Sequence, residues 1–283
     1  MLVRLTHKRM ELAVSFVAGV MLGVALLHMI PHAFEMRMDA LPLAATSKHS
    51  GSHAVVTPLM LWLIGGFLTM FFIERFFCFH HHDAPGSEGE NTAGRSSGGH
   101  NHGHGFDHHH HRDGHGHDHH TFTWTGTAIG LTLHSLVDGV ALAASVEAAR
   151  HASDGSFSVT TLAGLGTFVV IFLHKPFDSL TLGTMMTLGR RSTSFKHSIN
   201  TAFSLMIVAG VGLFHLGLTA GEQSGGLVAV ALAFCAGTFL CISMSDLLPE
   251  LQFHQHDRGK LSMSLLLGLG VAWAVGALEV RMH

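Results

Sequence analysis

The chain has 283 residues, of which 47% are hydrophobic and only 12% are charged, and its formal net charge at pH 7 is −3. Its three cysteines, Cys78, Cys235 and Cys241, follow no recognisable pairing pattern, which excludes a disulfide scaffold. Charged residues fall between long apolar runs, so we expect an all-α, polytopic helical membrane protein that lies in a lipid bilayer and has no nucleic-acid partner.

Seven segments are apolar over the roughly 20 residues that a helix needs to cross a bilayer. They are Leu12–Phe34, Val56–Phe79, Phe122–Ala148, Phe157–Leu188, His197–Ala220, Gly226–Glu250 and Leu261–Val280. The first follows three basic residues, as a secretory signal would, but its apolar run is longer and ends without a small-residue cleavage site. We therefore expect seven transmembrane helices, with the first one retained.

Basic residues favour one side of the predicted membrane. Eleven lysines and arginines lie at the amino terminus or in connections on the same side of the membrane, against four on the opposite side. Because cytoplasmic segments are rich in lysine and arginine, we expect a cytoplasmic amino terminus and an external carboxyl terminus. The pattern leaves open whether the protein lies in the plasma membrane or an endomembrane.

A histidine-rich segment, residues 80–121, divides the chain. It separates residues 1–79, with the first two spans, from residues 122–283, with the other five, and it contains 14 of the 27 histidines. Glycine, serine, aspartate and histidine cannot bury apolar surface, so we expect a disordered cytoplasmic loop. Its imidazoles suit loose binding of zinc, nickel or copper, and composition does not decide between a metal buffer and a solvated linker.

The first and sixth spans share a pattern at a constant offset of 218 (234 − 16). The matched pairs are Phe16 and Phe234, Ala18 and Ala236, Gly19 and Gly237, Leu22 and Leu240, His28 and Asp246, and Pro31 and Pro249. An odd number of crossings separates these spans, so the pattern predicts an inverted repeat. The alternative is convergent packing of small residues.

The remaining spans match less well. The second and seventh share the spacing of Gly65 and Glu74 with Gly270 and Glu279. The third and fourth spans share a His-x-x-x-Asp pattern, and the fifth has no counterpart. We therefore expect that one helix is missing ahead of Met1.

The third and fourth spans carry the residues most suited to metal binding. Each contains a His-x-x-x-Asp pair, His134 with Asp138 and His174 with Asp178. Residues four apart share one face of a helix, and ionisable groups in lipid are costly, so two matched pairs favour a shared divalent ion over chance. Two imidazoles and two carboxylates suit zinc, iron(II) or manganese(II). A buried hydrogen bond within one pair is the alternative.

The runs HSLVDGVALAAS and HKPFDSLTLG, the histidine-rich segment before them, and AGTFLCISMSDLLPEL near the end resemble the ZIP zinc transporters over nearly the whole chain. The resemblance implies eight transmembrane helices and movement of metal towards the cytoplasm by one helical bundle moving against another. It places the metal site on His134, Asp138, His174 and Asp178. Zn²⁺ is then the transported substrate, with Fe²⁺, Mn²⁺ and Cd²⁺ as further candidates, and a homodimer is left open.

The chain departs from the family at three points. Members with two metals place ligands directly after each histidine, where this chain has Ser135 and Lys175. A protonated lysine has only donors, so we predict one ion in the transport site, with the ammonium near the place of a second cation. Pro176 comes one residue earlier than the usual proline of this family helix, and the first family helix is absent.

Polar residues mark a candidate transport path, and Ser135 and Lys175 beside the predicted ligands belong to it. His28 falls near the outer end of the first span, and Asp246 and Glu250 fall near the inner end of the sixth. We expect them to receive and release the ion at opposite mouths. The alternative is ordinary hydration or pairing at helix ends.

Two other functions also use histidine and aspartate in a membrane. A cation-diffusion exporter resembles a six-helix protein with a cytoplasmic carboxyl-terminal domain, for which the chain has no room before His283. An intramembrane zinc hydrolase, with Ser135 beside His134, needs three protein ligands and an open position, whereas the sequence offers four repeat-related ligands. We therefore expect a divalent metal transporter and not an enzyme.

Overall fold

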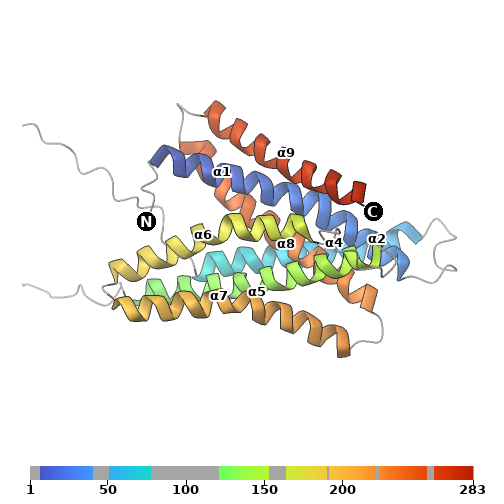
Figure 1. The fold of residues 1–283 in the computed structure, drawn as a ribbon, viewed down its shortest axis with the longest axis horizontal. Coiled ribbons are helices and arrows are strands. Elements are labelled where there is room, and N and C mark those ends of the chain that lie inside the picture. The colour runs from blue at the N-terminus through green and yellow to red at the C-terminus, as the bar shows by residue number, and fades with distance from the viewer. Residues whose placement is uncertain are drawn as a thin grey trace, which may run out of the picture.

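The computed structural model describes residues 7–40, 51–77, 121–152, 164–189, 191–220, 224–253 and 258–282. Within these ranges every regular element is helical (Figure 1). The elements are α1 (His7–Val24), η1 (Ala25–Met29), α2 (Ile30–Asp39), α4 (Gly51–Phe77), α5 (Thr121–Ala152), α6 (Leu165–Leu188), α7 (Thr193–Ala220), α8 (Ser224–Phe253) and α9 (Arg258–Met282). The predicted all-α class is confirmed, and the histidine-rich stretch 80–120 lies outside the described residues.

Seven helical segments in the described part of the chain are long and apolar enough to cross a membrane, as predicted. The first is continuous from Arg9 to Asp39 and includes α1, η1 and α2. The fourth begins at Leu165, and the preceding Gly164 has a φ of 72°, a left-handed conformation that glycine adopts without strain. The expected start at Phe157 lies outside the described residues.

The first span changes its winding at η1, a turn of π-helix directly before Pro31. Proline has no N–H, so it cannot continue the hydrogen-bond pattern of the preceding turn. The π turn buries Ala25, His28 and Met29, while Leu26 and Leu27 of the same turn remain exposed. It therefore determines which side chains of this span point into the bundle.

Helices α1 and α9 form a tight parallel pair, side by side in Figure 1. Ser15 Oγ donates a hydrogen bond to the Leu261 carbonyl at one end, and Ser264 Oγ donates one to the Leu12 carbonyl. Further along, a Cβ on Gly268 would overlap the carbonyl oxygen of α1 that it faces. Glycine at such a contact lets two backbones approach closely.

The same contact occurs in the parallel pair α4 and α8. Each pair contains two glycines, and each glycine faces a carbonyl oxygen three residues before the other glycine. The equivalent positions are Phe16 and Phe234, Gly19 and Gly237, Leu265 and Leu63, and Gly268 and Gly66. The first two of these equivalences are those of the sequence repeat, so the packing supports an inverted repeat that exchanges α1 with α8 and α9 with α4.

The structure corrects the register by which the repeat relates α4, the second span, to α9, the seventh. The contacts relate α4 to α9 by an offset of 202 (268 − 66), whereas the sequence match through Gly65 and Gly270 used 205 (270 − 65). A Cβ on Gly65 or Gly270 would meet nothing within 4 Å. The match of Gly65 and Glu74 with Gly270 and Glu279 was therefore wrong, because glycine spacing alone does not say which glycine faces a neighbour.

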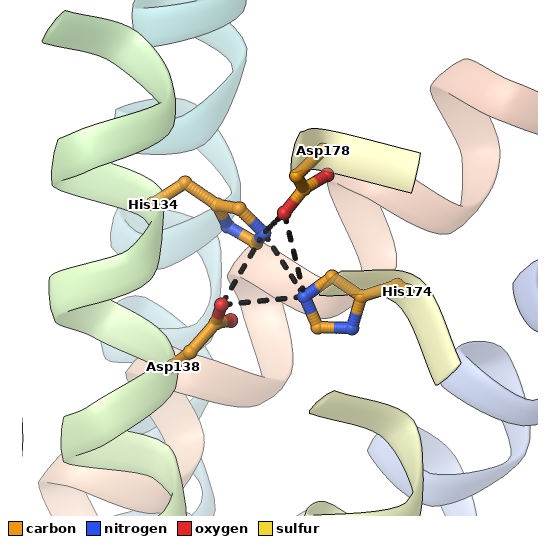
Figure 2. A group of neighbouring side chains, drawn as sticks. All are labelled: His134, Asp138, His174 and Asp178. Carbon is orange, nitrogen blue, oxygen red and sulfur yellow. Dashed lines mark hydrogen bonds and ion pairs between the residues drawn. The ribbon is translucent and has the colours of Figure 1, made fainter. Parts of the chain in front are cut away.

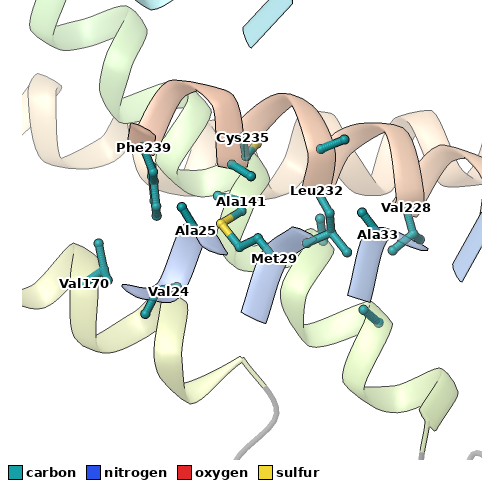
Figure 3. Packing of buried hydrophobic residues seen from close by; sticks show 14 of the residues in the cluster. Val24, Ala25, Met29, Ala33, Ala141, Val170, Val228, Leu232, Cys235 and Phe239 are labelled. Carbon is teal, nitrogen blue, oxygen red and sulfur yellow. The ribbon is translucent and has the colours of Figure 1, made fainter. Parts of the chain in front are cut away.

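A buried apolar layer joins α1, η1, α5, α6 and α8 (Figure 3). Ala25 and Met29 of η1 belong to this layer together with Ala141 of α5, Val170 of α6 and Phe239 of α8. All five are among the buried side chains of one continuous cluster. This layer closes the centre of the bundle on the side towards α2.

Candidate metal centre

The four predicted ligands converge between α5 and α6 (Figure 2). His134 and Asp138 lie one turn apart on α5, and His174 and Asp178 lie one turn apart on α6. Each offers one ligand atom, and the four atoms all lie within 4.8 Å of one another. His134, Asp138 and His174 are buried, and Asp178 is partly exposed.

The distances suit a four-coordinate ion. The two Nε2 atoms of His134 and His174 are 3.3 Å apart, and Oδ2 of Asp138 lies 3.5 Å and 3.2 Å from them. Oδ2 of Asp178 lies 3.6 Å and 3.9 Å from the same two nitrogens. Ligand atoms bound tetrahedrally to zinc at about 2.0 Å are about 3.3 Å from one another. A small contraction around a central ion would bring all four within bonding distance.

The hydrogen bonds around the centre orient one imidazole for metal binding. His174 Nδ1 lies 2.7 Å from the Val170 carbonyl, so Nδ1–H donates to it and Nε2 directs its lone pair to the centre. Among the described residues, Asp178 Oδ2 and His134 Nδ1 are buried and have no hydrogen-bond partner. Burying a polar atom without a partner costs free energy. A cation in the centre would be the missing partner of Asp178 Oδ2.

Lys175 also reaches the centre. Its Nζ donates to Ser135 Oγ at 2.6 Å and to Asp138 Oδ2 at 2.8 Å, and it lies 3.8 Å from Asp178 Oδ2. Phe203 of α7 places its ring 4.5 Å from the same nitrogen, a cation–π contact. The structure thus brings Ser135 and Lys175 together beside the four predicted ligands.

Two aromatic neighbours were missed from the sequence. Phe203 contacts Lys175, and Phe239 of α8 packs edge-on to the ring of His174. Phe203 comes close because α7 packs tightly on α5, where Gly139 faces the Ile207 carbonyl. Nothing in the sequence pattern of α7 or α8 distinguishes these phenylalanines from those that face lipid.

A cavity of about 320 Å³ adjoins the centre on one side. It extends from His174 and Asp178 between α1 and α6 to Met10, close to the start of α1, and Thr184, close to the end of α6. Its other lining residues are Val14, Val17, Met21, Phe177, Leu180, Thr181 and Ile242. The apolar layer of Figure 3 closes the opposite side, so the cavity leads from the centre towards the amino-terminal end of α1.

Of the predicted path residues, Ser135 and Lys175 lie at the centre, and His28 lies away from it. His28 is buried in η1, and its Nε2 lies 2.9 Å from the Ala272 carbonyl of α9. Asp246 and Glu250 belong to α8, but their side chains are outside the described residues. Their predicted role therefore stays a prediction.

Comparison with known proteins identifies the family. The family model described as ZIP Zinc transporter matches residues 2–276. Zinc transporter ZIP13 of Mus musculus is 25% identical over 266 residues, which cover 93% of this chain and 68% of the relative. Zinc transporter ZIP9-B of Xenopus laevis is 24% identical over 98% of this chain and 85% of its own length. No solved structure matches the chain. The chain therefore belongs to the ZIP zinc transporter family, whose members are transporters and not enzymes, and it is an integral membrane protein.

Proposed function

We propose that the protein carries one Zn²⁺ at a time towards the cytoplasm, with His134, Asp138, His174 and Asp178 as its ligands. The convergence of two imidazole nitrogens and two carboxylate oxygens within 4.8 Å carries the proposal. Zinc accepts such a set in tetrahedral geometry. Since the centre contains no thiolate, the ion is held loosely enough to exchange, and Fe²⁺, Mn²⁺ and Cd²⁺ are further substrates that this ligand set would accept.

Two observations, taken together, support transport towards the cytoplasm. The cavity beside His174 and Asp178 extends towards the amino-terminal end of α1. The excess of lysine and arginine supports a cytoplasmic location for this end and for the histidine-rich segment. An ion that leaves the centre through this cavity is therefore released inside the cell, and Asp246 and Glu250 of α8 are proposed to receive it there.

The contacts of Lys175 support transport of a single ion. Its ammonium group is held by Ser135, Asp138 and the ring of Phe203. An ammonium group repels a second divalent ion and offers no lone pair to bind one. The two carboxylates of the centre thus serve one divalent ion and one fixed lysine charge.

Uptake by purified protein tests this function. We expect proteoliposomes containing the full chain to accumulate zinc, and His174→Ala to abolish the accumulation. In right-side-out vesicles, with the amino terminus inside, zinc should move inwards; movement only in the opposite direction would overturn the proposed direction. Chemical cross-linking in the same vesicles checks whether the protein is also a homodimer.

A further inference from the structure

A second polar cavity lies at the other end of the helices that form the centre. It has a volume of about 20 Å³, which is enough for one water-sized species. Two imidazoles and two hydroxyl groups line it, together with small residues at the end of α5 and the start of α6. The lining residues are His28, His32, Ser145, Ala149, Gly164, Gly166 and Thr167.

This cavity is in register with the centre. Ser145 follows Asp138 by seven residues on α5, and Thr167 precedes His174 by seven residues on α6. Seven residues make two helical turns, so these hydroxyl groups lie on the same helix faces as the ligands, about 10 Å further out. The helix turns between the two levels carry buried apolar residues, among them Ala141 of α5 and Val170 of α6. Cavity, apolar layer and centre therefore follow one another along the groove between α5 and α6.

Both imidazoles of the cavity are oriented by an oxygen atom. His28 Nε2 lies 2.9 Å from the Ala272 carbonyl, and His32 Nδ1 lies 3.1 Å from Oε2 of Glu35. Metal-binding histidines commonly have one ring nitrogen held in this way by a carbonyl or a carboxylate. The hydroxyl groups of Ser145 and Thr167 are 2.7 Å apart and can rotate to present oxygen atoms.

The two helix ends beside this cavity largely offset each other, and a nearby carboxylate leaves the surroundings net negative. The amino-terminal end of α6 carries a partial positive charge, which opposes a cation, and the carboxyl-terminal end of α5 carries a partial negative charge, which favours one. The carboxylate of Glu35, held on His32, adds further negative charge. A divalent ion bound there would be held more weakly than in the centre, which contains two carboxylates.

We propose that this cavity, here called the outer site, is a waiting position for the divalent ion, which His28 and His32 bind before the apolar layer opens towards the centre. This inference rests on the proposed function and adds a second station to it. A waiting ion raises the chance that the centre is loaded each time it faces outwards, so its effect is greatest when zinc is scarce.

Gly166 offers a way to fill the outer site without removing a ligand. A Cβ at this position would lie 3.3 Å from Nδ1 and 3.4 Å from Cε1 of His28, and it would occupy space in front of the ring. Gly183, on the same helix, would place a Cβ within 4 Å of nothing and is the matched control. His32→Ala removes the second imidazole, which is partly exposed and lies outside the apolar cluster.

Anomalous X-ray scattering from crystals of the full chain grown with saturating zinc tests the site directly. We expect one peak among the four central ligands and a weaker one between His28 and His32, with the weaker peak absent in Gly166→Ala. A central peak without an outer peak in the wild type would overturn the inference. Absence of both peaks would count against the proposed function as well.

Uptake kinetics give a second readout. At zinc concentrations far below half-saturation, we expect Gly166→Ala and His32→Ala to slow uptake by about tenfold, the lower end of the usual loss when a metal site is disturbed. The maximal rate at saturating zinc should stay unchanged, and Gly183→Ala should match the wild type throughout. Wild-type rates at low zinc for both Gly166→Ala and His32→Ala would overturn the inference, whereas loss of uptake by the wild type itself would point to the proposed function.

Discussion

Nζ of Lys175 lies 2.8 Å from Oδ2 of Asp138, the same carboxylate oxygen that lies 3.2 Å from Nε2 of His174. One carboxylate therefore serves both a fixed ammonium group and the candidate ion. Because Asp138 belongs to α5 and the other two residues to α6, this shared oxygen also links the two helices that form the centre. We therefore expect the number of ions that the centre holds to depend on Lys175.

Replacing Lys175 should change that number. In Lys175→Glu a carboxylate takes the place of the ammonium group, and with Asp138 and Asp178 it offers a second set of oxygen ligands. We expect anomalous scattering to find two zinc ions in the centre of the variant and one in the wild type. Lys196→Glu is the control, since Lys196 is partly exposed and donates a hydrogen bond to Thr187 outside the centre. Two ions in the wild-type centre would contradict the role given to Lys175.

Asp138→Asn should abolish most transport. The amide has nearly the same shape but lacks the charge, so both the ion and Lys175 lose a partner in a buried place. We expect zinc uptake into proteoliposomes to fall by about 100-fold or more, since even residues behind the ligands contribute 10–100-fold to metal affinity. Glu147→Gln makes the same change on α5 at a carboxylate that pairs with Arg150, and it should leave uptake intact. Equal uptake by the two variants would be inconsistent with the proposed centre.

Two neighbouring glycines of α4 should respond differently to the same substitution. A Cβ on Gly66 would overlap the Phe234 carbonyl oxygen of α8, whereas one on Gly65 would meet nothing within 4 Å. We expect Gly66→Ala to lower the free energy of unfolding by about 1–3 kcal/mol, as overpacking does. Gly65→Ala should be neutral or slightly stabilising, because alanine favours the helix. Thermal unfolding of both variants in detergent measures the difference, and equal midpoints would show that the α4 and α8 backbones are not in close contact.

Filling the large cavity should block release without preventing binding. Thr184 lines this cavity on α6, and Thr184→Trp would occupy the space between α6 and α1. We expect zinc to bind in the centre, as seen by anomalous scattering, while uptake into proteoliposomes falls by about tenfold or more, equivalent to a barrier at least 1.4 kcal/mol higher. Phe172→Trp on the same helix is the control, because Phe172 is 67% exposed and lies outside the cavity. If Thr184→Trp transports zinc at the wild-type rate, the ion does not leave by this route.

The seven spans and the pairing of the candidate ligands on single helix faces were predictable because each depends on local spacing. Apolar runs of sufficient length identify spanning helices, and a spacing of four places His134 and Asp138 on one face of α5. The start of α6 was less predictable, because apolar residues continue ahead of Gly164 and only its positive φ marks the helix boundary. The π turn at η1 was likewise absent from the prediction, although Pro31 is a local signal for it.

Contacts between helices required the tertiary structure. An aromatic residue such as Phe203 has the same local pattern whether it faces lipid or Lys175, and the packing of α7 on α5 decides between them. The register that relates α4 to α9 in the repeat was also mistaken from sequence, since Gly65 and Gly66 are equivalent until the rotation of the helix is known.

The sequence by itself determined the family, the number of spanning helices and the four candidate ligands, because length, apolarity and helical spacing are properties of one segment at a time. Only the tertiary structure decided which glycines bring backbones together, where Lys175 rests, and that an open cavity lies on one side of the centre and an apolar layer with a small polar cavity on the other. These features depend on how each helix is rotated and placed against its neighbours. That rotation is set by the packing of all the helices together.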